Sequence, residues 1–75
     1  MLALDPKADF DLCEQIADHI RDRTYGAVQH VAVAVAGPEI VIRGLATTFY
    51  LKQLATQAAV EITAERPLRN EITVA

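Results

Sequence analysis

The chain has 75 residues, 52% of them apolar, with a net charge of −3 and a pI near 5.1. This length suits a single domain over residues 1–75, and the apolar content argues against a disordered chain. No basic stripe is present, so the composition excludes a typical nucleic-acid binder. The chain has no tryptophan and its aromatic content is 5%, so we expect an aliphatic core.

The cysteine count and the N-terminus bear on the compartment. Cys13 is the only cysteine, so no internal disulfide can form. The first residues lack the basic segment and the sustained apolar stretch of a signal peptide, and no apolar run approaches the ~20 residues of a membrane span. The sequence as given therefore predicts a cytoplasmic protein. A periplasmic location is the alternative if the chain is a fragment of an exported protein.

An amphipathic helix is predicted near the start of the chain. It begins at Asp5-Pro6 or at Asp9, because aspartate caps free N–H groups and proline fits the first helical position, and it ends at Arg23. Its apolar face repeats every fourth residue, at Leu12, Ile16 and Ile20. Six acidic residues and three basic ones lie within residues 5–23. The helix therefore carries the net negative charge of the chain. We interpret its acidic side as a solvated face, with a binding surface for a cation or a basic partner as the alternative.

A β-hairpin is predicted in the middle of the chain, where valine and alanine alternate and Gly37-Pro38 marks a turn. Its strands cover about residues 28–35 and 39–45, each with one buried face. The residues expected to face the helices are Val31, Val33, Val35, Ile40, Ile42 and Gly44. Glycine within a strand often marks a close approach of another backbone. We interpret Gly44 as the point where the second helix packs on the sheet.

A second helix and a third strand complete the chain. Thr47 or Thr48 is expected to cap the helix, which must end before Pro67, and the third strand covers residues 68–74. The buried stripe of the helix comprises Leu51, Leu54, Ala55, Ala58 and Ile62. The order of elements predicts an α+β fold, an αββαβ two-layer sandwich in which two helices cover one face of a three-stranded sheet.

No arrangement of residues indicates catalysis or metal binding. His19 and Cys13 lie six residues apart on one helix and point in different directions, and His30 opens a strand. No pair has metal-ligand spacing, no glycine-rich phosphate loop is present, and the chain contains no serine. We therefore expect no catalytic residue, no cofactor and no metal, in a protein that is not an enzyme. Asn70, at an inward strand position, is expected to bond backbone groups near a helix end, with ligand contact as the alternative.

The start of the second helix offers one candidate binding surface. Phe49, Tyr50 and Lys52 combine apolar, amphipathic and cationic groups there, as membrane-surface anchors do. These three residues are the candidate contacts to a lipid or a partner. The competing interpretation, which we favour for Phe49, is that its ring folds back over the end of the sheet and completes a small core.

The face of the sheet that the helices leave open offers a second candidate surface. On it lie Ala32, Ala34, Val41, Arg43 and Leu45, with Glu71 and Thr73 beside them. This face is more apolar than a solvated antiparallel face usually is, and contiguous apolar patches mark interaction sites. We expect the chain to form a homo-oligomer, or to dock a protein partner, through this open sheet face. Addition of a strand at a sheet edge is the rival route.

Three segments carry a family resemblance: VAVAVAGPEIVIRG, the run LKQLA at residues 51–55, and LRNEITV near the end. Leu68, Asn70, Ile72 and Val74 supply a closing pattern of hydrophobic-x-Asn-x-hydrophobic-x-Val. In this order and spacing the segments resemble the BON domain family, the bacterial OsmY and nodulation domain, over about residues 9–75. The glycine of the family's second strand falls on Gly44.

The resemblance implies an αββαβ fold and a non-catalytic role in binding phospholipid membranes or protein partners. The chain departs from the family in having one copy, no signal sequence, and Arg66-Pro67 where a glycine usually precedes the last strand. We therefore expect a non-enzymatic binding module. The alternative is a structural or oligomerisation domain of a cytoplasmic protein with no lipid role. A KH-like RNA binder would need a GxxG loop and basic charge, so no nucleic-acid partner is expected.

Overall fold

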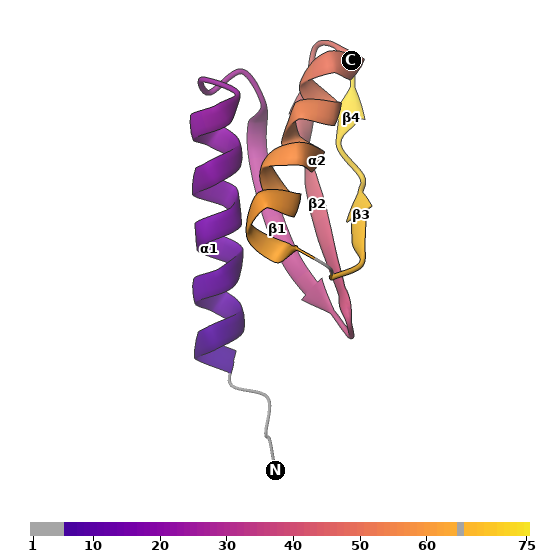
Figure 1. Ribbon diagram of the computed structural model, residues 1–75. Helices are drawn as coiled ribbons and strands as arrows, with labels where there is room; N and C mark the ends of the chain where they lie inside the picture. The colour runs from indigo at the N-terminus through magenta and orange to yellow at the C-terminus, as the bar shows by residue number, and fades with distance from the viewer. Residues whose placement is uncertain (1–5, 65) are drawn as a thin grey trace.

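The computed structural model describes residues 6–64 and 66–75. In chain order its elements are α1 (Pro6–Arg23), β1 (Gln29–Ala36), β2 (Glu39–Ala46), α2 (Phe49–Thr63), β3 (Leu68–Asn70) and β4 (Thr73–Val74) (Figure 1). Both helices lie on the same side of the sheet, α1 against β1 and α2 against β2, β3 and β4. The α+β class and the two-layer arrangement predicted from the sequence are thereby confirmed.

β2 is the central strand of a mixed sheet. β1 pairs with it antiparallel on one side, and β3 and β4 pair with it parallel on the other. The parallel direction follows from the α2 crossover, because a strand that returns through a helix runs the same way as the strand before it. β1 is therefore an outer strand, and within the described residues no strand pairs with its other edge.

The single strand predicted over residues 68–74 is wrong, because the structure has two short strands there. β3 ends at Asn70 and β4 begins at Thr73. Between them, the N–H of Ile72 donates to the side-chain Oδ1 of Asn70 at 2.9 Å. A bond from an asparagine side chain to the backbone two residues on competes with regular strand pairing. The sheet therefore has four strands rather than the predicted three.

A β-bulge near the start of β1 explains the glycine in β2. Two residues, His30 and Val31, lie opposite the single residue Gly44, and His30 has the left-handed φ of +56° found in such bulges. A Cβ at Gly44 would lie 3.0 Å from the carbonyl oxygen of Gln29 and 3.4 Å from the Val28 side chain. The close approach at Gly44 is made by β1, and the expectation that α2 packs there is wrong.

The core lies between the sheet and the helices, and in the part of the chain that the structure describes its apolar side chains are all aliphatic, with Thr24 as a buried polar residue. Ile40 and Ile42 of β2 are fully buried, as predicted, but Val41 between them is also buried at 8% exposure, so burial does not alternate strictly along this strand. The other members of the core cluster are Ile16, Ile20, Val28, Ala46, Ala55, Ala58, Ala59 and Ile72. Small alanines on α2 let this helix lie close to the sheet, so the domain fills its interior without an aromatic ring.

Candidate functional site

The aromatic side chains of the chain lie on its surface. The exposed fractions are 63% for Phe10, 96% for Tyr25, 72% for Phe49 and 69% for Tyr50. These are both phenylalanines and both tyrosines of the chain. Exposed apolar side chains that lie together in one patch often mark an interaction site. We call Tyr25, Phe49 and Tyr50 together the aromatic end.

The strand register places these three residues at one end of the sheet. Tyr25 lies in the turn between α1 and β1, and Phe49 and Tyr50 open α2 directly after β2. Gln29 pairs with Leu45, so the beginning of β1 and the end of β2 are adjacent. The two connecting segments therefore lie at the same end of the molecule, where Figure 1 shows them above the sheet.

Local hydrogen bonds hold both segments. The N–H of Gly26 donates to the carbonyl oxygen of Arg21 at 2.8 Å, and Tyr25 has a left-handed φ of +54°, as residues that close a helix often do. The side chain of Thr48 accepts from the N–H of Leu51 at 3.1 Å. Thr48 is therefore the helix cap, which settles the choice between the two threonines.

Phe49 does not complete the core, so the interpretation that we favoured from the sequence is wrong. Val28, just before β1, and Ala46, at the end of β2, are both buried and close the core at this end. With this space filled, the ring of Phe49 stays in solvent. The aromatic residue that the sequence analysis missed at this surface is Tyr25, and its signal was its place before the glycine that ends the first helix.

Lys52 adds a cation to the same helical turn. It follows Phe49 and Tyr50 on α2 and is half-buried. None of the ion pairs formed within residues 6–64 and 66–75 involves its ammonium group. The structure therefore brings together all three candidate residues that the sequence indicated at the start of the second helix.

The open sheet face is hollowed over the hairpin. A cavity of about 220 Å³ is lined by Ala32, Val33, Ala34, Ala36, Val41 and Arg43. Ala32 pairs with Arg43, and Ala34 pairs with Val41, across the two strands. The four residues predicted for this face are therefore neighbours. The floor of the cavity is formed by alanines, whose side chains end at Cβ and leave the space above them empty.

A network of ion pairs lies beside the cavity on this face. It links four residues in the order Glu39, Arg69, Glu71 and Arg43. The nitrogen–oxygen distances are 3.1 Å for Arg69–Glu39, 3.4 Å for Arg69–Glu71 and 2.9 Å for Arg43–Glu71. The hydrogen bond from Arg43, and after it the one from Arg69, holds the pKa of Glu71 below its usual range. The sequence analysis missed this ion-pair network. The pattern that could have indicated it is the presence of opposite charges at outward positions of two different strands.

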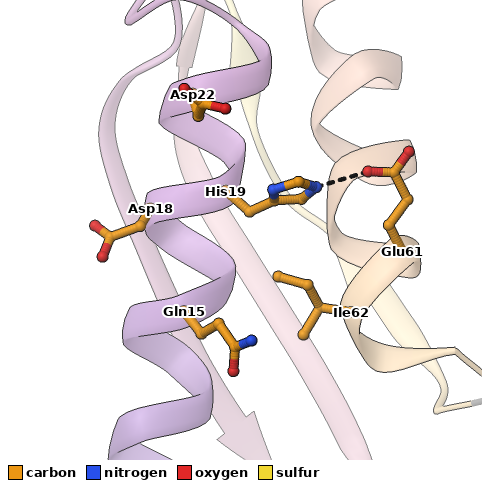
Figure 2. Close-up of a pocket in the computed structure, with 6 residues that line it drawn as sticks. All are labelled: Gln15, Asp18, His19, Asp22, Glu61 and Ile62. Atoms are coloured by element: carbon orange, nitrogen blue, oxygen red, sulfur yellow. Dashed lines mark hydrogen bonds and ion pairs between the residues drawn. The ribbon is translucent and has the colours of Figure 1, made fainter.

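A groove of about 570 Å³ runs between the helices, lined by Gln15, Asp18, His19, Asp22, Glu61 and Ile62 (Figure 2). Nε2 of His19 lies 2.6 Å from Oε1 of Glu61, and Arg23 donates to both oxygens of the same carboxylate. The hydrogen bond from Arg23, and then the one from His19, lowers the pKa of Glu61. Side chains of α1 already bond both oxygens of this carboxylate. We therefore interpret the cluster as a polar contact that stabilises the packing of the two helices.

The remaining polar candidates carry no further site. Cys13 is half-buried, and burial is the main cause that raises the pKa of its thiol, which disfavours the reactive thiolate. The residues that the structure describes contain no group of three His, Cys, Asp or Glu side chains placed to hold a metal ion. Within the same residues, no helix combines the length and hydropathy that a membrane span requires.

Comparison with known proteins gives the chain no family. No family model matches the sequence, and no curated protein matches it. The exposed residues of the aromatic end and of the open sheet face are therefore the features that bear on function.

Proposed function

We propose that the chain is a non-enzymatic binding module that contacts a phospholipid surface through its aromatic end. The observation that carries the proposal is the exposure of Tyr25, Phe49 and Tyr50 beside a core that is complete without them. Removing such rings from water is favourable by about 25 cal/mol for each Å² of apolar surface covered. Aromatic rings, tyrosine in particular, suit the headgroup region of a bilayer, which is apolar on one side and wet on the other.

The charge distribution indicates which lipid surface is suitable. The acidic residues of the chain concentrate on α1, so an anionic membrane would repel the body of the domain. Lys52 supplies one cation beside Phe49 and Tyr50. We therefore expect zwitterionic phosphatidylcholine to bind at least as well as an anionic mixture.

The sequence resemblance to the BON family supports the same proposal. That family is proposed to bind phospholipid membranes or protein partners, and its αββαβ order agrees with the order α1-β1-β2-α2-β3 of this fold. A protein partner with an apolar pocket is the competing occupant of the aromatic end.

Co-sedimentation of the full chain with phosphatidylcholine vesicles tests the proposal. Wild type should pellet with the vesicles, and the double variant Phe49→Ala/Tyr50→Ala should bind roughly tenfold more weakly, because two anchoring rings are removed. Val60→Ala is the matched control, since Val60 is an exposed apolar residue on α2 outside the aromatic end, and this variant should bind as wild type does.

Two results would count against the lipid proposal. Wild type that stays in the supernatant with both phosphatidylcholine and phosphatidylcholine–phosphatidylglycerol vesicles would exclude the membrane contact. Equal binding by wild type and the double variant would show that another part of the surface makes it.

A further inference from the structure

β1 has an unpaired edge, and nothing in its sequence prevents another strand from pairing with it. It is the outermost strand of the sheet, and β2 is the only strand of the described residues that pairs with it. Its sequence, QHVAVAVA, has no charged residue and no proline, which are the devices that usually block an exposed edge. After the bulge at His30, residues 31–36 form a regular run. Alternate backbone N–H and C=O groups of this run point away from β2, toward any strand that comes alongside.

α1 presents a distinct set of side chains on the side of this edge. Phe10, Glu14, Ala17 and Arg21 recur at intervals of four and three residues, so they lie along one face of the helix. We call this set the outer face of α1. The side of α1 toward α2 is a different one, marked by the residues that line the groove of Figure 2. Because α1 packs against β1, the outermost strand, the face turned away from α2 lies on the side of the unpaired edge.

We infer that two copies of the chain associate about a two-fold axis at this edge. β1 of one copy pairs antiparallel with β1 of the other, and the outer faces of the two α1 helices pack against each other. The result is one continuous sheet through both copies, with two helices of each copy on the same side. A two-fold interface of this kind requires a surface that complements itself, and both the strand and the helix meet that requirement.

Charge selects the antiparallel contact between the helices. Glu14 and Arg21 are equally distant from the point midway between Ala17 and Asp18. A two-fold axis through that point places Glu14 of each copy opposite Arg21 of the other, so two ion pairs form. Arg21 already pairs with Asp18 of its own helix at 2.9 Å, whereas no ion pair within the described residues involves Glu14. The second copy supplies the cation that Glu14 lacks.

The one exposed apolar residue of the outer face fits the same contact. Phe10 is 63% exposed and lies outside the aromatic end, toward the start of α1. About the axis midway between Ala17 and Asp18, Phe10 of one copy lies opposite the turn that follows α1 of the other copy, and aromatic rings covered in this way commonly anchor an interface. Ala17, between Glu14 and Arg21, is only 5% exposed and is already buried within its own copy, so a second helix would contact Phe10, Glu14 and Arg21.

Helix and strand contacts can share one axis. α1 rises about 1.5 Å per residue, so the midpoint between Ala17 and Asp18 lies about 8 Å from the end of the helix. β1 runs back beside α1 and rises about 3.3 Å per residue, so the same distance along it ends near Ala32. The axis that pairs the helices therefore crosses the unpaired edge within β1.

The open sheet face is the rival surface for a second copy. Its four charged residues are already paired within one copy, and its alanine cavity offers no side chain to insert. The edge, in contrast, has unpaired backbone groups and a glutamate whose ion pair only the second copy completes. The structure therefore favours the edge.

Sedimentation equilibrium of the full chain tests the inference by charge reversal. At submillimolar concentration, wild type should sediment at twice the monomer mass of 8.2 kDa. Glu14→Arg and Arg21→Glu should each lower the association constant about tenfold, because each replaces two attractions by two repulsions. The double variant Glu14→Arg/Arg21→Glu should associate as wild type does, since opposite charges again face each other. Both positions are exposed, so far-UV circular dichroism should show a folded chain in every variant.

Three results would overturn the inference. Wild type that sediments as a monomer would exclude the dimer. A double variant that associates no better than the single variants would remove the pairing of Glu14 with Arg21. Ala34→Glu is the matched variant for the open sheet face, and a dimer that survives both single reversals but is lost in Ala34→Glu would belong to that face.

Discussion

The side-chain Nδ2 of Asn70 donates a hydrogen bond to the carbonyl oxygen of Lys52 at 2.9 Å, which joins β3 to the first turn of α2. The same nitrogen lies 2.5 Å from the hydroxyl of Thr56, one turn further along the helix. The expectation that Asn70 bonds backbone groups near a helix end is confirmed. One side chain thus holds in place the helical turn that bears two of the three rings of the aromatic end.

Substitution of Asn70 should destabilise the domain. Asn70→Ala removes one donor to the Lys52 carbonyl and leaves the N–H of Ile72 without its acceptor, which should lower the free energy of unfolding by about 1–3 kcal/mol. Asn70→Asp keeps an acceptor for the N–H of Ile72 but sets a carboxylate against the Lys52 carbonyl, so it should be no better than alanine. Urea denaturation followed by far-UV circular dichroism measures both. An aspartate variant as stable as wild type would show that only the bond to Ile72 matters.

Truncation at Ile42 should open a cavity at the centre of the core. Ile42 is fully buried on β2, and its neighbours belong to both helices and the sheet. Ile42→Ala should lower the free energy of unfolding by about 2–5 kcal/mol, which is enough to unfold much of a domain this small. Leu45→Ala, on the opposite face of the same strand and 41% exposed, is the control and should cost far less. Similar losses for the two variants would contradict the inward orientation of Ile42.

A side chain at Gly44 should disrupt the bulge in β1. Its Cβ would meet a backbone oxygen at 3.0 Å, and backbone atoms cannot rotate away as a flexible side chain can. Gly44→Val should therefore be clearly less stable than Ala32→Val, which places the same valine side chain at an exposed position of the neighbouring strand. Thermal unfolding of the two variants provides the comparison. Equal melting temperatures would mean that β1 shifts freely at this point.

The contact of Glu61 on α2 with Arg23 and His19 on α1 should make the free energy of unfolding depend on pH. Arg23 first, and then His19, lowers the folded-state pKa of Glu61. A glutamate with a lowered folded pKa stabilises the fold above its unfolded pKa of about 4.3, and this contribution is lost as the pH falls through the folded pKa. Glu61→Gln should therefore lower the urea midpoint at neutral pH, and the difference from wild type should shrink as the pH falls below the unfolded pKa and through the lowered folded pKa. A difference that stays constant with pH would show that the carboxylate charge plays no part.

The elements of the fold could be predicted from local residue patterns. Strict alternation around Gly37-Pro38 defines the hairpin, because a strand with one buried face needs an apolar residue at every second position. Thr48 supplies a cap whose bond closes within three residues of the chain. Such signals lie within a few residues of the structure that they specify, so a single sequence is sufficient to read them.

The long-range contacts could not be predicted in the same way. Glu61 meets His19 across 42 residues of sequence, and Arg43 meets Glu71 across 28. Each pair depends on how two elements pack, which no short pattern specifies. The exposure of Phe49 had the same origin, since whether a ring is needed in the core depends on how completely Val28 and Ala46 fill that end. The cross-strand neighbours Ala32–Arg43 and Ala34–Val41 could be read from the sequence because they needed only the alternation of the hairpin, whereas the burial of Val41 could not.

Both tyrosines of the chain, Tyr25 and Tyr50, are exposed in the folded protein, and the chain contains no tryptophan. Unfolding therefore moves neither phenol ring out of an apolar interior, and intrinsic fluorescence should change little as the fold is lost. The same two rings belong to the proposed contact surface, where a change in the groups that quench them would alter the intensity of their emission. The tyrosine emission intensity of this protein should therefore respond to contact at the aromatic end and change little when the domain unfolds.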